Sequence, residues 1–254
     1  AMVGVKRIVQ SPIQTIETNI RGTELVLKHA LRTQCKVLVA STSEVYGKGA
    51  KIPLSETDDM LLGPTTKSRW SYACSKAVDE FLGLAYHKQH GLPVAVARFF
   101  NTVGPRQVGQ YGMVVPRFVQ QALSGGPITV YGDGTQSRCF CLVSDVVGAI
   151  TKLMETPAAF GQVFNIGADE ETTILGLAEK VRAKIDPKLE FKKVPYEEAY
   201  EAGFEDLKRR VPDLTKIGKA IGYRPMHTLD QILDKVIAFH RQPKGAGQKK
   251  EGIA

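Results

Sequence analysis

The chain has 254 residues, of which 43% are hydrophobic and 24% charged, with a formal net charge of +8. Such a chain can bury a sizeable core in one domain or in two closely packed ones. No apolar run approaches the ~20 residues that span a bilayer, and the start lacks a secretory signal pattern. We therefore expect a cytoplasmic protein without membrane association.

The basic excess does not indicate nucleic-acid binding. Most basic residues are dispersed, and the one dense basic segment, residues 244–250, falls within residues 242–254, which we expect to form a flexible tail. We expect solvated surface cations and a pocket for an anionic ligand, with no nucleic-acid partner. The cysteines lack the spacing of metal ligands, so we expect no metal site and reduced thiols at Cys35, Cys74, Cys139 and Cys141.

Long helical patterns and short apolar runs alternate in the first hundred residues. Apolar residues at helical spacing predict helices, and short apolar runs predict strands buried on both faces. The second helix is ended by Gly91 and Pro93. In chain order, the predicted elements are a helix over 11–32, a strand over 37–40, a helix over 70–89 and a strand over 94–99. This alternation predicts an α/β fold with a parallel, doubly wound sheet.

The pattern is more irregular after Phe99. We predict helices over 115–123, 144–155, 173–184 and 229–240, with Ser144 and Asp145 capping the second of them, and strands over 128–131, 138–143 and 163–166. Residues 1–99 and 144–168 then form a dinucleotide-binding domain of Rossmann type. Residues 100–143 and 169–241 form a smaller α/β substrate domain.

One hydroxyl and one Tyr-Lys pair carry the chemistry. Thr42 lies at the end of a predicted strand, and Tyr72 and Lys76 lie four residues apart on a predicted helix. Positions i and i+4 share a helix face, so the Lys76 ammonium is expected to lower the pKa of the Tyr72 phenol. Thr42 can hydrogen-bond a substrate hydroxyl while Tyr72 exchanges its proton. This set indicates an oxidoreductase with a nucleotide cofactor.

These motifs resemble those of the extended short-chain dehydrogenases/reductases, the NAD-dependent epimerase/dehydratase family. Within that family the chain is most similar to the UDP-glucuronate decarboxylases, including UDP-xylose synthase. The segments that carry the resemblance are 41–47, 67–72, 75–76, 136–140, 203–206 and 209–213.

The resemblance implies roles for individual residues. Thr42, Ser43, Glu44, Tyr72 and Lys76 form the catalytic set, and Tyr72 and Lys76 also hold the nicotinamide ribose. For NAD, Phe99 lies against the nicotinamide and Asn19 supports the local hydrogen bonds. For a UDP-sugar, the implied binding residues are Asn101, Tyr131, Arg138 and Arg210, with Tyr131 stacked on the base and the two arginines on the diphosphate.

Ser43 and Glu44 narrow the predicted reaction. Dehydratases of the family carry an acid where Ser43 stands, and 4-epimerases lack a Glu at the position of Glu44. The pair is the decarboxylase pattern, in which C4 of a UDP-hexuronate is oxidised and carbon dioxide then leaves. Two alternatives stay open: a UDP-sugar 4-epimerase, and a non-catalytic remnant that binds a nucleotide sugar.

The remnant hypothesis arises at the start of the chain. The glycine-rich GxxGxxG turn of the family does not occur in this sequence, which begins at about the end of the family's fourth strand. We therefore expect an N-terminally truncated Rossmann sheet with few contacts to the NAD adenosine and pyrophosphate, and with an exposed strand edge. The resemblance also implies a homodimer formed through helices 11–32 and 70–89.

Overall fold

The computed structural model describes residues 1–4, 8, 10–49, 51–109, 112–195, 198 and 208–242. The expected tail, apart from Gln242, and the family motif at 203–206 lie outside these residues. Among the described residues no helix is long and apolar enough to cross a membrane.

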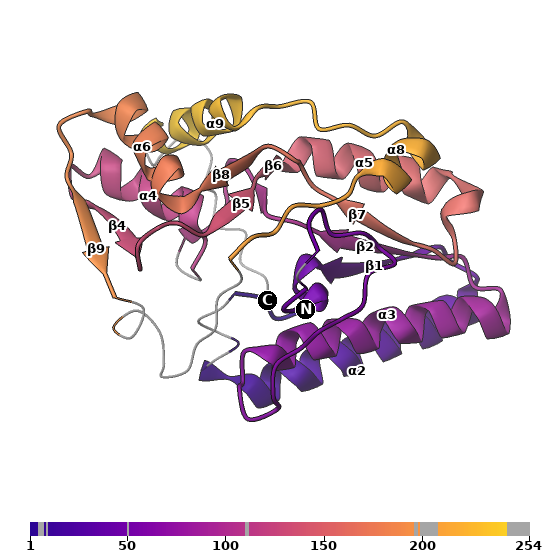
Figure 1. Cartoon of the computed structure of the whole chain (residues 1–254). Helices are drawn as coiled ribbons and strands as arrows, with labels where there is room; N and C mark the ends of the chain where they lie inside the picture. Colours follow the sequence, from indigo (N-terminus) through magenta and orange to yellow (C-terminus); the bar gives the residue numbers. More distant parts are fainter. Residues whose placement is uncertain are drawn as a thin grey trace.

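A three-stranded parallel sheet lies at the centre of the molecule (Figure 1). Its order is β1 (Val37–Thr42), β2 (Val94–Phe99) and β7 (Val163–Ile166), so β1 lies at an edge of the described sheet. Thr42 pairs with Phe99, and Phe99 with Ile166, so the strands end together at one edge. Residues 94–97 of β2 are fully buried, as an interior strand requires. The predicted α/β fold is confirmed.

Helices cover both faces of this sheet. The helices α2 (Pro12–Thr33) and α3 (Trp70–His90) lie side by side on one face, and α5 (Val143–Glu155) and α8 (Thr215–Ile221) lie on the other (Figure 1). Helix α3 ends at Gly91, whose backbone φ of 67° is left-handed and unstrained only without a Cβ. Helix α3 packs against β1, and its first turn carries Tyr72.

The other region has short two-stranded sheets around a helical core. The helices are α4 (Val114–Leu123), α6 (Ile174–Ile185) and α9 (Leu229–Arg241). Strand β4 (Ile128–Tyr131) pairs with β9 (Phe191–Val194), β5 (Ser137–Cys139) with β8 (Glu171–Thr173), and β3 (Thr102–Val103) with β6 (Cys141–Leu142). The division into two domains at the predicted boundaries stays a prediction.

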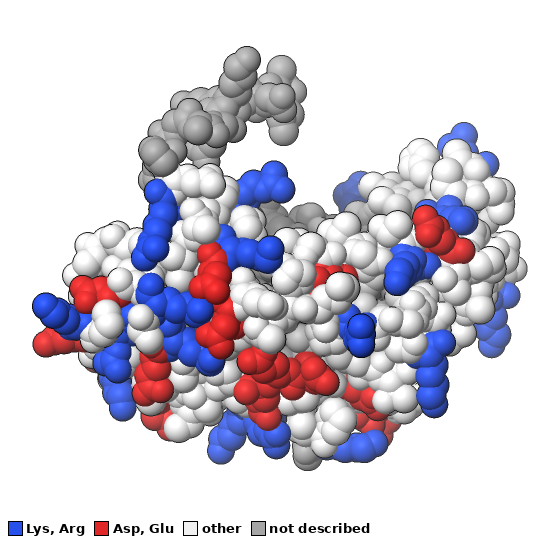
Figure 2. Space-filling model, turned by 90° about the horizontal axis from the view of Figure 1, so that it is seen from above, with Lys and Arg blue, Asp and Glu red and all other residues white. Residues whose placement is uncertain are grey.

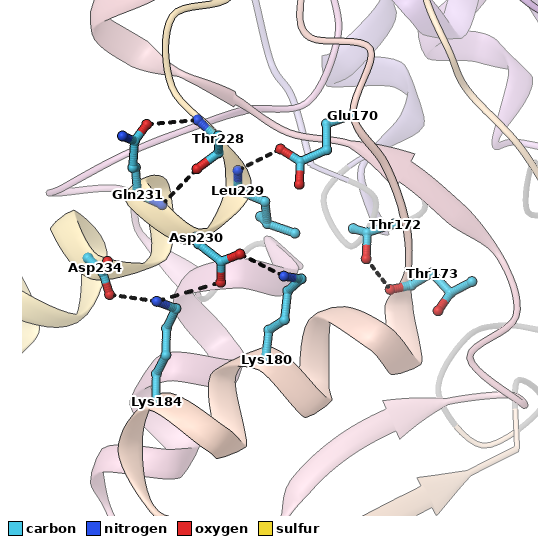
Figure 3. Close-up of polar contacts among 10 residues, drawn as sticks. All are labelled: Glu170, Thr172, Thr173, Lys180, Lys184, Thr228, Leu229, Asp230, Gln231 and Asp234. Carbon is cyan, nitrogen blue, oxygen red and sulfur yellow. Dashed lines mark hydrogen bonds and ion pairs between the residues drawn. The ribbon is translucent and has the colours of Figure 1, made fainter.

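Polar contacts join α6 to α9 (Figure 3). Lys180 pairs with Asp230 at 2.7 Å and Lys184 with Asp234 at 2.8 Å. Helix α9 begins with a capping box, in which Thr228 and Gln231 satisfy each other's backbone N–H groups. The backbone N–H of Leu229 also donates to Glu170, just before β8. The start of α9 is therefore tied both to α6 and to the strand that carries Glu171.

The predicted strand over 138–143 is wrong in its extent. Residues 137–139 pair with β8 and residues 141–142 with β3, because the two halves belong to different sheets. Helix α5 starts at Val143, so Ser144 and Asp145 lie in its first turn and do not cap it. The Asp145 carboxylate instead contacts His227 Nδ1 at 2.8 Å and accepts from the backbone N–H of Met226. It thus anchors the connection between α8 and α9.

Candidate active site

A cavity of about 590 Å³ opens where β1 and β2 end. Seven of the predicted site residues line it, and they come from the β1 end, α3, the β2 end and the segment before α8. They are Thr42, Ser43, Glu44, Tyr72, Phe99, Asn101 and Arg210. Since ligands of open α/β sheets bind at the carboxyl ends of the strands, this cavity is the candidate active site.

The end of β1 positions three of these side chains. After Thr42 the chain enters the 3₁₀ turn η1 (Ser43–Tyr46), and Thr42 is its N-cap. The Thr42 hydroxyl oxygen accepts a hydrogen bond from the backbone N–H of Glu44 at 3.2 Å. This capping bond holds the turn that presents Ser43 and Glu44 to the cavity, while Thr42 keeps a donor proton for another partner.

Tyr72 lies in the first turn of α3 and is hydrogen-bonded to Thr42. Burial raises the pKa of the Tyr72 phenol well above its usual range, and the Glu44 charge raises it further. The Thr42 hydrogen bond and the Arg210 charge act in the opposite direction. In this structure the phenol is therefore protonated at neutral pH.

The pKa of Tyr72 is raised in this structure and not lowered as the Tyr-Lys spacing predicts. The Lys76 ammonium is buried and forms an ion pair with Asp79, one turn further along α3. The Asp79 carboxylate neutralises the cation that was expected to act on the phenol, and Asp79 itself raises the pKa of Tyr72. The i, i+3 spacing of Lys76 and Asp79 is the signal that could have indicated this pair from the sequence.

Glu44 and Arg210 form an ion pair at the wall of the cavity. Arg210 Nη1 lies 3.5 Å from Glu44 Oε1, and the arginine is 8% exposed. The Arg210 Nε is buried and has no hydrogen-bond partner among the described residues. A guanidinium with a spare donor at a cavity wall suits a carboxylate or a phosphate oxygen.

Four predicted site residues do not line this cavity: Asn19, Lys76, Tyr131 and Arg138. Asn19 connects α3 to the start of the chain, donating to Ser75 Oγ at 3.1 Å and accepting from the Met2 N–H at 2.6 Å. The guanidinium carbon of Arg117 lies over the Tyr131 ring, 4.0 Å from the ring centroid. Arg138 is buried and donates to its neighbour's carbonyl, Ser137 O, at 2.7 Å.

The cavity also has an apolar wall that sequence patterns did not reveal. Helix α5 contributes Val143, Val146, Val147 and Ile150, next to Ala40 and Phe99. Val143 and Val147 are 40% and 54% exposed, so they leave apolar surface open at the cavity. A helical apolar spacing predicts which side chains face a neighbour, but it does not tell a core contact from a ligand wall.

Charged side chains show no single-sign field on the face drawn in Figure 2, where basic and acidic residues are interspersed. The described residues include no cluster of three or more His, Cys, Asp or Glu side chains that could hold a metal ion. The four cysteines are free, with Cys139 and Cys141 buried and Cys35 and Cys74 exposed.

The chain is similar to several known proteins. The profile of the NAD dependent epimerase/dehydratase family matches residues 1–167. UDP-N-acetyl-alpha-D-glucosaminuronate decarboxylase of Bacillus cytotoxicus is 43% identical over 243 residues, covering 95% of this chain and 75% of that protein. UDP-glucuronic acid decarboxylase 5 of Arabidopsis thaliana is 39% identical over 225 residues, covering 85% of this chain and 60% of its own length. UDP-glucose 4-epimerase of Thermotoga maritima, solved with UDP-glucose, superposes with a TM-score of 0.85 at 28% identity, covering 95% and 75% of the two chains.

Proposed function

Because the chain belongs to the NAD dependent epimerase/dehydratase family, we propose that it acts in the NAD-dependent decarboxylation of a UDP-hexuronate. The observation that carries the proposal is the meeting of Thr42 and Tyr72 with Ser43, Glu44 and Arg210 in one cavity. The decarboxylase names of relatives at 37–43% identity support it. The reaction, the substrate and the residue roles are proposals for this chain.

The described residues fit a nicotinamide ring and its ribose. The apolar wall formed by α5, Ala40 and Phe99 offers the dry surface that a flat ring needs. Tyr72 and Lys76 would hold the ribose hydroxyls. The Lys76 ammonium has three donors, so the pair with Asp79 leaves donors for a ribose. When bound, oxidised NAD supplies a hydride acceptor and a positively charged ring.

The side chains at the cavity then bind the C4 hydroxyl and transfer its proton. Thr42 hydrogen-bonds the C4 hydroxyl, and Tyr72 receives its proton as the C4 hydride departs, which leaves a 4-keto sugar. Since the phenol is protonated in the structure, it becomes a base only when a positive charge lies nearby.

Loss of carbon dioxide follows from the β-keto acid. The bond between C5 and the carboxylate carbon breaks, and its electron pair moves onto the C4 oxygen as an enolate. Ser43 and Glu44 would face the departing carboxylate, and the Glu44 charge repels it in the ground state. Arg210 or water then protonates C5, and the C4 carbonyl re-forms.

A direct assay separates decarboxylase from epimerase. The purified protein is incubated with NAD and UDP-glucuronate labelled with ¹³C at C6, and labelled carbon dioxide and sugar products are followed by NMR. We expect release of labelled carbon dioxide. Interconversion at C4 with the label retained would refute decarboxylation and favour the epimerase. Calorimetric titration with NAD tests the remnant hypothesis, which predicts no binding and no turnover.

We also propose a cytoplasmic homodimer. The outer faces of α2 and α3 leave large apolar side chains exposed, namely Ile13, Ile16, Leu25, Val26 and Phe81. A second copy would bury this surface, as the resemblance implies. The free thiols support a reducing compartment. Analytical ultracentrifugation of the wild type and Phe81→Glu tests the dimer, because the charge should shift the protein to monomer.

A further inference from the structure

Glu171 of β8 joins two segments that each carry an arginine predicted to bind the diphosphate. Its Oε1 accepts from Arg209 Nε at 2.8 Å and its Oε2 from Arg209 Nη2 at 2.7 Å. Ser137 Oγ donates to the same carboxylate. A bidentate guanidinium and a hydroxyl thus fix the plane of this carboxylate.

Each partner of Glu171 immediately precedes one of the arginines. Ser137 precedes Arg138 on strand β5, where successive side chains point to opposite faces. Arg209 precedes Arg210, and these two side chains also go to different partners. The Arg209 side chain pairs with Glu171 and is 56% exposed, whereas the Arg210 side chain is 10% exposed and reaches Glu44 in the cavity.

Backbone bonds make the two segments one unit. The Ser137 N–H donates to Lys208 O at 2.9 Å, and the Leu54 N–H donates to Val211 O at 2.8 Å. The backbone on either side of Arg209 and Arg210 is therefore held, and the rotation that remains is limited by the Arg209–Glu171 pair. With the backbone held on both sides, this pair acts on the direction in which Arg210 points.

The Glu171 carboxylate is charged over the whole working range of pH. Arg209 and the Ser137 hydroxyl lower its pKa to about 2, against the small opposing effect of burial. The ion pair of Glu171 with Arg209 therefore keeps its charges from mildly acidic to neutral pH.

We propose that Glu171 is a positioning residue for substrate binding, whose carboxylate, tied to Ser137, holds Arg209 so that Arg210 is presented to the diphosphate of a UDP-sugar. It acts on the ligand only through these neighbours. The proposal rests on the proposed function, because it takes Arg210 as a group that binds the diphosphate.

The test measures the affinities of UDP and uridine by calorimetry. Glu171→Ala and Arg209→Ala should each weaken UDP binding by about tenfold, the size typical of groups that support a binding side chain. Uridine affinity should not change, because uridine has no diphosphate for Arg210 to bind. A general loss of structure would lower both affinities and the melting temperature, and that outcome would overturn the proposal.

Coupling to Arg210 gives the sharper readout. In an Arg210→Ala background, Glu171→Ala should have no further effect on UDP affinity. The exchange of charges in Glu171→Arg with Arg209→Glu should restore part of the lost affinity. Equal additional losses in both backgrounds would overturn the positioning role.

Asp234→Ala is the matched control, since it removes another exposed carboxylate that pairs with a basic side chain in the same region. Its UDP affinity should equal that of the wild type, and an equal loss there would overturn the specific role of Glu171. If the unaltered protein binds no UDP, the proposed function fails. If it binds UDP and Glu171→Ala binds equally well, the further inference alone fails.

Discussion

The ion pair between β2 and α3 at the parallel sheet is buried, whereas the ion pairs between α6 and α9 are exposed to solvent. Arg98 of β2 and Glu80 of α3 are 6% and 4% exposed, and the guanidinium donates Nε to Oε1 at 3.0 Å and Nη2 to Oε2 at 2.8 Å. In the α6–α9 pairs, the side chains of Asp230 and Asp234 are 49% and 66% exposed.

The difference matters at the cavity. Tyr72 of α3 and Phe99 of β2 belong to elements held together by the buried pair, which also accepts the Ser41 hydroxyl next to Thr42. Breaking a buried pair leaves an uncompensated charge, so these elements keep one geometry. Arg210 itself pairs with Glu44, and its segment is held further by the exposed pair of Arg209 with Glu171 and by backbone bonds. The elements that carry Tyr72 and Phe99 are therefore held by a buried pair, whereas the segment that carries Arg210 is held partly by an exposed pair, which is easier to change.

The largest expected effect is on catalysis. Tyr72→Phe should lower turnover of UDP-glucuronate by about 10²–10⁴-fold, the contribution of a positioned proton-transfer group. The measurement is kcat from carbon dioxide release. Tyr46→Phe is the control, because this buried phenol donates to Asn165 Oδ1 at 2.7 Å and does not line the cavity. It should lower stability by about 1–2 kcal/mol and keep kcat; equal losses of kcat in both variants would contradict the assignment.

The next effect is on stability near the sheet. Glu80→Ala should lower the free energy of unfolding by about 3–5 kcal/mol, because it leaves the Arg98 charge buried without its partner. Urea denaturation measures the change. Adding Arg98→Met should recover part of the loss, since the apolar chain needs no partner. A double variant as unstable as the sum of both single variants would show that the pair is not coupled.

The stability contributed by the exposed pair at Glu171 should depend on pH. The pKa of Glu171 is lowered to about 2 in the folded protein, from 4.5. A depressed folded pKa stabilises the protein above the unfolded pKa, and this contribution is lost as pH falls from about 4.5 to about 2. The urea midpoint of the wild type should exceed that of Glu171→Gln above pH 5, and the difference should vanish near pH 2. A difference that does not depend on pH would contradict the role of charge.

The smallest effect is expected at the α6–α9 surface. Asp234→Asn should change the free energy of unfolding by less than about 1 kcal/mol, because water screens the pair with Lys184. The change should shrink further when thermal unfolding is repeated at high salt. A loss as large as that of Glu80→Ala would erase the contrast between the two regions.

Sequence patterns predicted well wherever one element decides its own structure. The strands over 94–99, 128–131 and 163–166 have the predicted bounds, since a continuous apolar run suits a buried strand. The patterns failed where the extent of a strand depends on which other strand it pairs with. Residues 138–143 read as one strand, yet their two halves pair with different strands, and no local pattern shows this.

The candidate site divides in the same way. The hydroxyl strand end and the Tyr-Lys spacing predicted that Thr42 and Tyr72 share one site, and the family resemblance added Ser43 and Glu44; all four line the cavity. The pairing of Lys76 with Asp79, and with it the raised pKa of Tyr72, depends on burial that the motif does not contain. The apolar wall of α5 was likewise hidden, because its valines read as ordinary core positions.

By itself, the sequence determined the α/β alternation, the strand ends and the kinds of reacting groups, since these follow from apolar spacing and side-chain chemistry within a few residues. Only the tertiary structure decided which groups face one another. Glu44 and Arg210 are 166 residues apart in the chain, and Arg209 and Glu171 are 38 apart. Their meeting depends on how the segments pack, and packing also sets the burial that shifts the pKa of Tyr72.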